Sequence, residues 1–207
     1  MGIKHAFIKD SILKHNINKF ISDRYKQAGI TRVDVQATPM LTRIIVYCKY
    51  PQRVLSRGLE QTKQQISKLF NVQNPQIVAI QIQNERLEPK LVAEFLARKL
   101  ELGGNPRKLA ESMVRSIIMN GAIGAEIRFS GKLKAKNAES TSIVKRAGYL
   151  PKAGYPVNYL LHAKAVANTK YGIIGIKVTI TPADIKLPDK EIRQVELPKN
   201  IASASNI

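Results

Sequence analysis

The sequence is poor in cysteine and lacks tryptophan, and it has no long apolar run. Cys48 is the single cysteine among 207 residues, which excludes an internal disulfide and a cysteine-rich zinc site. No segment approaches the ~18 consecutive apolar residues of a membrane span, and the first ten residues lack the apolar core of a secretory signal. We therefore expect a protein of the reducing cytoplasm with no membrane partner.

Acidic residues are also scarce, and this shortage indicates the kind of partner. The chain carries 34 Lys and Arg but only 15 Asp and Glu, for a formal net charge of +19. Hydrophobic residues make up 44% of the chain, which is enough to bury a core. A folded protein this basic repels itself unless a polyanion neutralises it, so nucleic acid is the expected partner.

The sequence offers no constellation that supports catalysis. The three histidines have no metal-ligand spacing, and there is no Ser/His/Asp set, carboxylate pair or GxxxxGK[ST] phosphate loop. We therefore expect no enzyme activity, no cofactor and no catalytic or metal-binding residue.

The first hundred residues predict an alternation of helices and strands. Hydrophobic periodicity predicts helices at 8–28, 59–70 and 89–100, and strands at 32–37, 43–49 and 77–82. This order predicts a three-stranded sheet with helices on one face, and it matches an RNA-binding KH domain of type II topology. We assign residues 1–103 to this domain.

The second half predicts a smaller α/β domain. A helix is expected at 106–120, and strands at 124–134, around 157–167 and at 172–182. The domain covers residues 104–182, and residues 183–207 are expected to form an extended tail. The fold class is therefore α+β.

Two groups of cations are candidates for contact with RNA around the predicted helices. In the loop where a KH domain carries its GxxG motif, Ser56 and Leu59 replace the glycines, but Arg53 and Arg57 remain able to reach phosphates. In the second domain Arg107 and Lys108 begin a helix, where cations oppose the helix dipole at a cost of a few tenths of a kcal/mol. Arg115 follows two turns later, and a polyanion would offset this cost.

A third group of cations follows the predicted strand that begins at Gly124. If the strand extends far enough, alternate residues on one face include four basic side chains, and two more come shortly after. These six residues are Arg128, Lys132, Lys134, Lys136, Lys145 and Arg146. Like charges on one face repel each other, so we expect these residues to contact phosphates.

Several segments resemble the S-three family of small-subunit ribosomal proteins in its archaeal and eukaryotic form. They are TPMLTRIIVY (38–47), NPQI (74–77), MNGAIGAEIRFSGKLKAKNAES (119–140), PVNYLLHAKA (156–165) and YGIIGIKVTI (171–180). The resemblance implies a ribosomal protein in the head of the small subunit that binds ribosomal RNA beside neighbours of the S-ten and S-fourteen families.

The resemblance also implies a role at the entrance of the messenger RNA channel. The residues of the family that line this entrance are matched here by Arg107 and Lys108, whereas Glu111 occupies a position that is basic in bacterial relatives. The residues alone leave two alternatives open. The first is a free-standing KH protein that binds single-stranded nucleic acid. The second is a nucleic-acid-processing enzyme, for which no acid/base set is visible.

Overall fold

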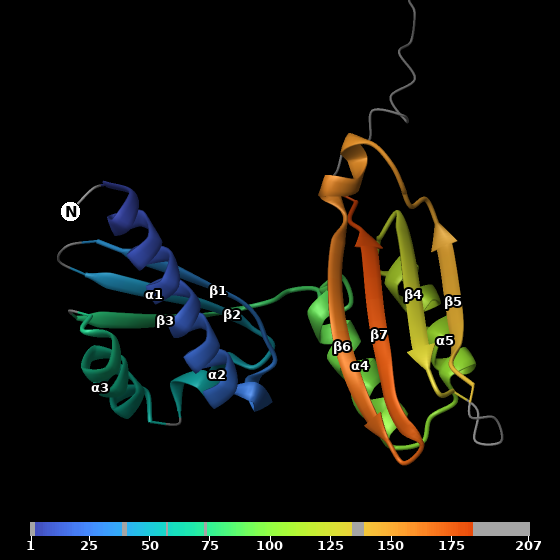
Figure 1. Cartoon of the computed structure of the whole chain (residues 1–207), viewed down its shortest axis with the longest axis horizontal. Helices are drawn as coiled ribbons and strands as arrows, with labels where there is room; N and C mark the ends of the chain where they lie inside the picture. Colours follow the sequence, from blue (N-terminus) through green and yellow to red (C-terminus); the bar gives the residue numbers. More distant parts are fainter. Residues whose placement is uncertain (1–2, 39–40, 57, 73, 134–138, 184–207) are drawn as a thin grey trace, which may run out of the picture.

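The computed structural model describes residues 3–38, 41–56, 58–72, 74–133 and 139–183. Figure 1 shows two lobes joined by a single connection. The first lobe contains a three-stranded sheet and the second a four-stranded sheet. The expected α+β class, with a KH-type lobe followed by a small α/β lobe, is confirmed. The expected tail lies outside the described residues from residue 184 onward.

The first lobe follows the predicted order, with one additional short helix. Its elements are α1 (Ile3–Arg24), the 3-10 turn η1 (Lys26–Ala28), β1 (Ile30–Ala37), β2 (Thr42–Cys48), α2 (Pro51–Leu55), α3 (Leu59–Phe70) and β3 (Pro75–Gln81). The long first helix ends earlier than expected, at Arg24, and the turn η1 follows it. Gly29 ends this turn in a left-handed conformation with φ of 66° and leads the chain into β1. The short α2 begins at Pro51, whose constrained φ suits a first helical turn.

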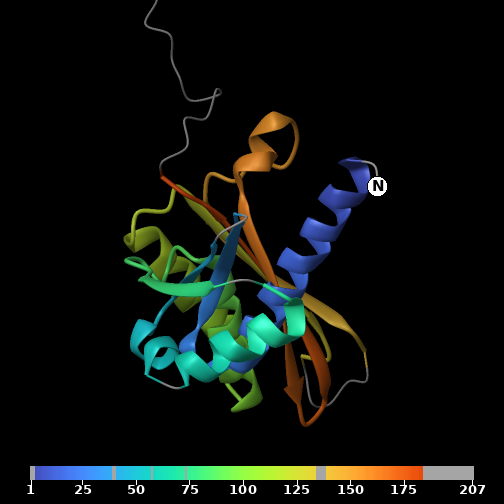
Figure 2. The same cartoon turned by 90° about the vertical axis from the view of Figure 1, so that its left-hand side faces the viewer.

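The helices of the first lobe pack on one face of its sheet. The central strand β2 pairs antiparallel with β1 and parallel with β3. Ile17 of α1 and Ile66 of α3 share a core with Ile44 and Val46 of β2. Figure 2 views the molecule from this lobe and shows α1 crossing the sheet, with its N-terminal end extending beyond the strands.

The opposite face of this sheet carries apolar side chains that no helix of the lobe covers. Because side chains alternate along a strand, Ile45 and Tyr47 point away from the core. The register places Val78 beside Ile45 and Ile80 beside Tyr47. Val78 is 41% exposed and Ile80 40% exposed. We call these four residues the apolar face.

The second lobe places two helices behind an antiparallel sheet. Its elements are α4 (Pro89–Glu101), α5 (Pro106–Met119), β4 (Gly124–Gly131), β5 (Thr141–Gly148), the 3-10 turn η2 (Tyr155–Tyr159), β6 (Leu161–Thr169) and β7 (Gly172–Thr181). The strand order is β5-β4-β7-β6. In Figure 1 the strands face the viewer and both helices lie behind them. Leu96 of α4, Ile117 of α5 and Phe129 of β4 meet in the core between these layers.

Helix α4 packs with the second lobe, although the boundary expected at residue 103 placed it in the first. Val92, Leu96 and Leu100 are buried in the second core, and α4 lies against β6 and β7. On this packing we propose that the boundary lies within residues 82–88, which connect β3 to α4. A helix that follows a sheet in sequence can cover either neighbouring sheet, and hydrophobic periodicity alone does not distinguish the two.

The strands of the second lobe differ from the expected ones in three places. β4 ends at Gly131, earlier than expected. β5 had no predicted counterpart, because its inward positions alternate through Thr141, Ile143, Lys145 and Ala147 and give a weak apolar pattern. Residues 155–159 form a 3-10 turn, so β6 begins only at Leu161.

Candidate nucleic-acid interface

The first turn of α5 presents two adjacent cations to solvent. Asn105 caps the helix: its side-chain oxygen accepts hydrogen bonds from the backbone N–H of Arg107 at 3.1 Å and of Lys108 at 3.5 Å. Both side chains are exposed, and neither forms a salt bridge with an acidic side chain among the described residues. The cap thus holds the helix end in place while two positive charges stand at the positive end of its dipole.

Further along the exposed side of α5, an acidic residue neutralises one of the predicted cations. Glu111 forms an ion pair with Lys145 of β5. This hydrogen bond and charge lower the pKa of Glu111 below its usual value, and the charges of Arg107 and Arg115 add to the effect. Lys145 points to the helix side of the sheet, so it is separated from Arg146, which points to the opposite side.

The helix-free face of the four-stranded sheet gathers cations from four strands. Arg128 of β4 lies directly opposite Lys177 of β7, and Lys177 lies directly opposite Lys164 of β6. Arg146 of β5 lies two residue pairs further along, opposite Glu126. We call Arg128, Arg146, Lys164 and Lys177 the cationic face. All four side chains are exposed.

The fold provides no salt bridge to the cationic face from a described acidic side chain. Glu126 is the acidic side chain on this surface, yet it forms no salt bridge with a described residue, and neither does any member of the cationic face. Like charges directly opposite each other in a sheet destabilise it. Folding alone therefore does not account for this arrangement, and a bound polyanion would.

Arg128 and Arg146 were predicted from the sequence, whereas Lys164 and Lys177 were missed. The prediction placed a row of cations along one strand, through Lys132, Lys134 and Lys136. Because β4 ends at Gly131, Lys132 lies beyond the strand, and the observed row runs across strands instead. Lys134 and Lys136 lie outside the described residues. The alternation within β6 and β7 marks Lys164 and Lys177 as outward positions, but their pairing with Arg128 depends on the strand order.

Lys132 belongs to a separate hollow of about 700 Å³ at the start of α5. Asn105, Lys170 and Tyr171 also line this hollow. Lys132 is half-buried there, so it lies apart from the cationic face.

The loop between α2 and α3 of the first lobe offers a weaker case for contact with RNA. The Arg53 guanidinium lies 4.9 Å from the centre of the Tyr50 ring and donates a hydrogen bond to the Gln27 carbonyl at 2.8 Å. These contacts hold Arg53 against its own lobe. Arg57 lies outside the described residues. Gly58, which directly precedes α3, adopts a left-handed conformation with φ of 63°.

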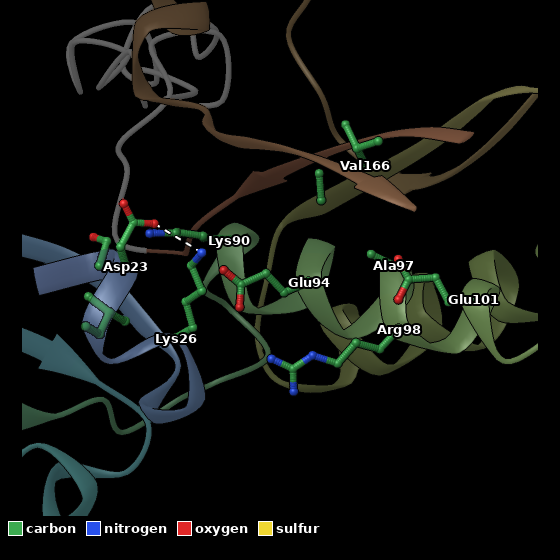
Figure 3. A pocket seen from close by; sticks show the side chains of 11 residues that line it. Asp23, Lys26, Lys90, Glu94, Ala97, Arg98, Glu101 and Val166 are labelled. Carbon is green, nitrogen blue, oxygen red and sulfur yellow. Dashed lines mark ion pairs between the residues drawn. The ribbon is translucent and has the colours of Figure 1, made fainter. Parts of the chain in front are cut away.

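A hollow of about 400 Å³ lies between the lobes, and its charges are mixed. Figure 3 shows both acidic and basic side chains around it. Asp23 of α1 and Lys26 of η1 form a salt bridge of 3.2 Å there. Glu94, Arg98 and Glu101 of α4 line its other side. This balance of charge gives no preference for an anion, so the hollow is not a candidate nucleic-acid site.

The described residues also lack two other kinds of feature. None of the described helices is both long and apolar enough to cross a bilayer. Within the same residues, no three His, Cys, Asp or Glu side chains group in a way that would hold a metal ion.

Comparison with known proteins identifies similar chains along most of this sequence. The family described as ribosomal protein S3, C-terminal domain, matches residues 96–180. The small ribosomal subunit protein uS3 of Methanoregula boonei is 30% identical, with 99% of this chain and 91% of the relative covered. The corresponding protein of Methanoculleus marisnigri is 32% identical over 91% of this chain and 82% of the relative. That of Methanocaldococcus jannaschii is 31% identical over 92% of each chain.

Proposed function

The chain belongs to the family of small ribosomal subunit protein uS3, and from this premise we propose that it lines the entrance of the messenger RNA channel. As a member of this family it is a structural, RNA-binding component of the small ribosomal subunit in translation and not an enzyme. Its ribosomal location is a consequence of the family, and we place it in the cytoplasm on the same ground.

The observation that carries the channel role is the exposed pair Arg107 and Lys108. Their positions at the start of α5 oppose the helix dipole, and neither side chain forms a salt bridge with a described acidic residue. Lysine and arginine side chains bind phosphates without reading base sequence. A channel that must accept every message requires this kind of contact, and fixed cations at its entrance would hold strands apart while the ribosome moves.

Charge reversal in α5 tests this role. Ribosomes carrying Arg107→Glu and Lys108→Glu are expected to initiate normally on unstructured messages and to slow on messages with a stable hairpin. The matched control is Arg98→Glu with Lys99→Glu. These two residues form an adjacent exposed pair in the last turn of α4, at the helix end where cations suit the dipole. Equal rates for both variants on structured messages would refute the channel role.

The neighbours of the chain in the subunit head are a further part of the proposal. We assign proteins of the S-ten and S-fourteen families as its protein partners. The apolar face supports a protein contact, because Val78 and Ile80 leave apolar surface in water that a neighbouring protein would bury. Ribosomal RNA would bind elsewhere, through the cations of the second lobe.

The free-standing KH protein remains the rival, and it predicts a different distribution in the cell. Members of the small subunit sediment with that particle through a sucrose gradient after a high-salt wash, whereas a free-standing binder is released. The degenerate loop at Ser56 and Leu59 and the engaged Arg53 argue against independent clamping of single strands.

A further inference from the structure

We propose that the cationic face binds the phosphate backbone of ribosomal RNA, on the side of the second lobe opposite to the exposed residues of α5. This inference rests on the proposed function, because it assumes a ribosomal RNA partner. It adds to that function the surface that binds ribosomal RNA and the direction in which the RNA crosses the sheet. It also adds two binding residues that the sequence did not predict, Lys164 and Lys177. It also separates the contact with ribosomal RNA from the contact with the messenger.

The spacing of the cations suits successive phosphates. Arg128, Lys177 and Lys164 occupy directly opposed positions on three adjacent strands. Neighbouring strands are about 4.8 Å apart, so the row spans about 10 Å. Each strand of duplex DNA carries one phosphate per about 3.4 Å of its axis, a spacing of the same order as that of the cations. The row can therefore contact several phosphates of an RNA strand that crosses the sheet approximately perpendicular to the β-strands.

Hydroxyl groups on both sides of the row support the same interpretation. Ser130 and Ser142 lie opposite each other on one side of the row, and Thr179 lies on the other side. Serine and threonine hydroxyls commonly donate to phosphate and sugar oxygens. Glu126 is the acidic exception on this surface, and its position opposite Arg146 limits the repulsion that it would exert on RNA. The surface therefore recognises backbone and positions the RNA.

The two faces of the lobe then serve two different RNA chains. Both helices cover one face of the sheet, and Arg107 and Lys108 lie on that helix layer. The cationic face lies on the other side of the same sheet, because its residues alternate with the core residues of the strands. Figure 1 shows both helices behind the strands. A fixed RNA on the sheet side would anchor the lobe, and a moving messenger would pass the helix side. The rigid packed core between them would hold α5 in place during movement of the message.

Salt dependence of RNA binding tests the assignment directly. The probe is a transcript of the small-subunit ribosomal RNA, titrated with full-length protein over a range of salt concentrations. Each phosphate contact contributes about 0.7–0.9 to the slope of log affinity against log salt. Lys177→Gln is expected to lower the slope by one such increment, and Lys164→Gln with Lys177→Gln by two. The matched control is Lys99→Gln, the same change on an exposed lysine of α4 in the helix layer behind the sheet, which is expected to leave the slope unchanged.

The outcomes separate this inference from the proposed function. An unchanged slope for the double variant, with normal RNA binding by the unaltered protein, would overturn the cationic face and leave the ribosomal role intact. An equal loss for Lys99→Gln would also overturn it, since the effect would then follow net charge alone. Failure of the unaltered protein to bind the transcript would overturn the ribosomal RNA contact itself.

A second measurement uses no variant, so a folding defect cannot affect its result. Lysine acylation of the unaltered protein, read by mass spectrometry, is expected to decrease at Lys164 and Lys177 when the transcript is bound. Lys63 of α3 in the first lobe serves as the reference. Unchanged acylation of both cationic-face lysines in the complex would contradict the proposal.

Discussion

The two lobes share one architecture but leave surfaces of different composition uncovered. In each lobe helices cover one face of a sheet, and the other face remains open. The open face of the first sheet presents Ile45, Tyr47, Val78 and Ile80 beside the charged Arg32 and Asp34 of β1. The open face of the second presents Arg128, Arg146, Lys164 and Lys177 beside the exposed Val144 and Val166. A buried core fixes only half of the side chains of a strand. The other half can differ in chemistry from lobe to lobe, and we propose that it serves protein contact in the first lobe and phosphate contact in the second.

The comparison assumes that each lobe has its own hydrophobic core. Truncating a buried side chain in one core tests this assumption, and this change has the largest expected effect. Phe129 is fully buried in the second core. Phe129→Ala is expected to destabilise the second lobe by about 3–5 kcal/mol. Hydrogen exchange measured by mass spectrometry should therefore accelerate in β4 and β7 and remain unchanged in β1 and β2. The matched variant Ile44→Ala, in the first core, should give the reverse pattern. Faster exchange in both lobes for either variant would show a single cooperative unit.

Charging the apolar face tests the other half of the comparison. Val78→Glu with Ile80→Glu changes two side chains that are already partly exposed, so the isolated protein should remain folded. Binding to the ribosomal RNA transcript should change little, because both positions lie in the first lobe. Incorporation into small subunits should fall severalfold, since the carboxylates would have to be buried against a neighbouring protein. Quantitative mass spectrometry of purified subunits measures this, and normal incorporation would contradict a protein contact at this face.

The sequence predicts the features that depend on neighbouring residues in one helix or strand. It does not predict the features that depend on contacts between separate elements. The helix over 59–70 and the strands around Ile44 and Ile176 follow from local periodicity, and the structure contains them. Arg107 and Lys108 could also be found, because Pro106 marks the start of their helix. These features depend on neighbours in sequence.

The remaining features depend on contacts between distant segments. Lys177 lies next to Arg128 only because β7 inserts between β4 and β6, and no local pattern encodes that order. The packing of α4 against β6 and β7, and not on the sheet that precedes it in the sequence, has the same cause. The ion pair between Lys145 and Glu111 likewise joins residues that are 34 positions apart in the chain, so no local pattern indicates it.

The cationic face predicts an unusual sign for a stability change. Lys177 has cationic neighbours on both sides, so Lys177→Gln removes two like-charge contacts. The free protein should gain a few tenths of a kcal/mol in stability, while its affinity for RNA falls. Denaturant unfolding at low salt measures the gain, which should shrink as salt rises because screening weakens the repulsion. A loss of stability at low salt would mean that Lys177 is compensated within the fold.

The smallest expected effect concerns the ion pair on the helix side. Because the folded-state pKa of Glu111 is lowered from 4.5, its contribution to stability is present above the unfolded pKa and is lost as pH falls through the folded pKa. Glu111→Gln should therefore lower the melting temperature slightly near neutral pH, and the difference should vanish in acid. Solvent screening keeps the effect small, since Glu111 is exposed. A difference that persists well below the ordinary pKa of Glu would exclude an electrostatic origin.

The central claim is that one sheet separates a surface for ribosomal RNA from a surface for the messenger. A reconstruction of the small subunit that contains this chain, with a message in its channel, tests the claim most directly. The account predicts ribosomal RNA phosphates within salt-bridge distance of Lys164 and Lys177, and messenger backbone beside Arg107 and Lys108. Protein or open solvent over the cationic face would contradict it.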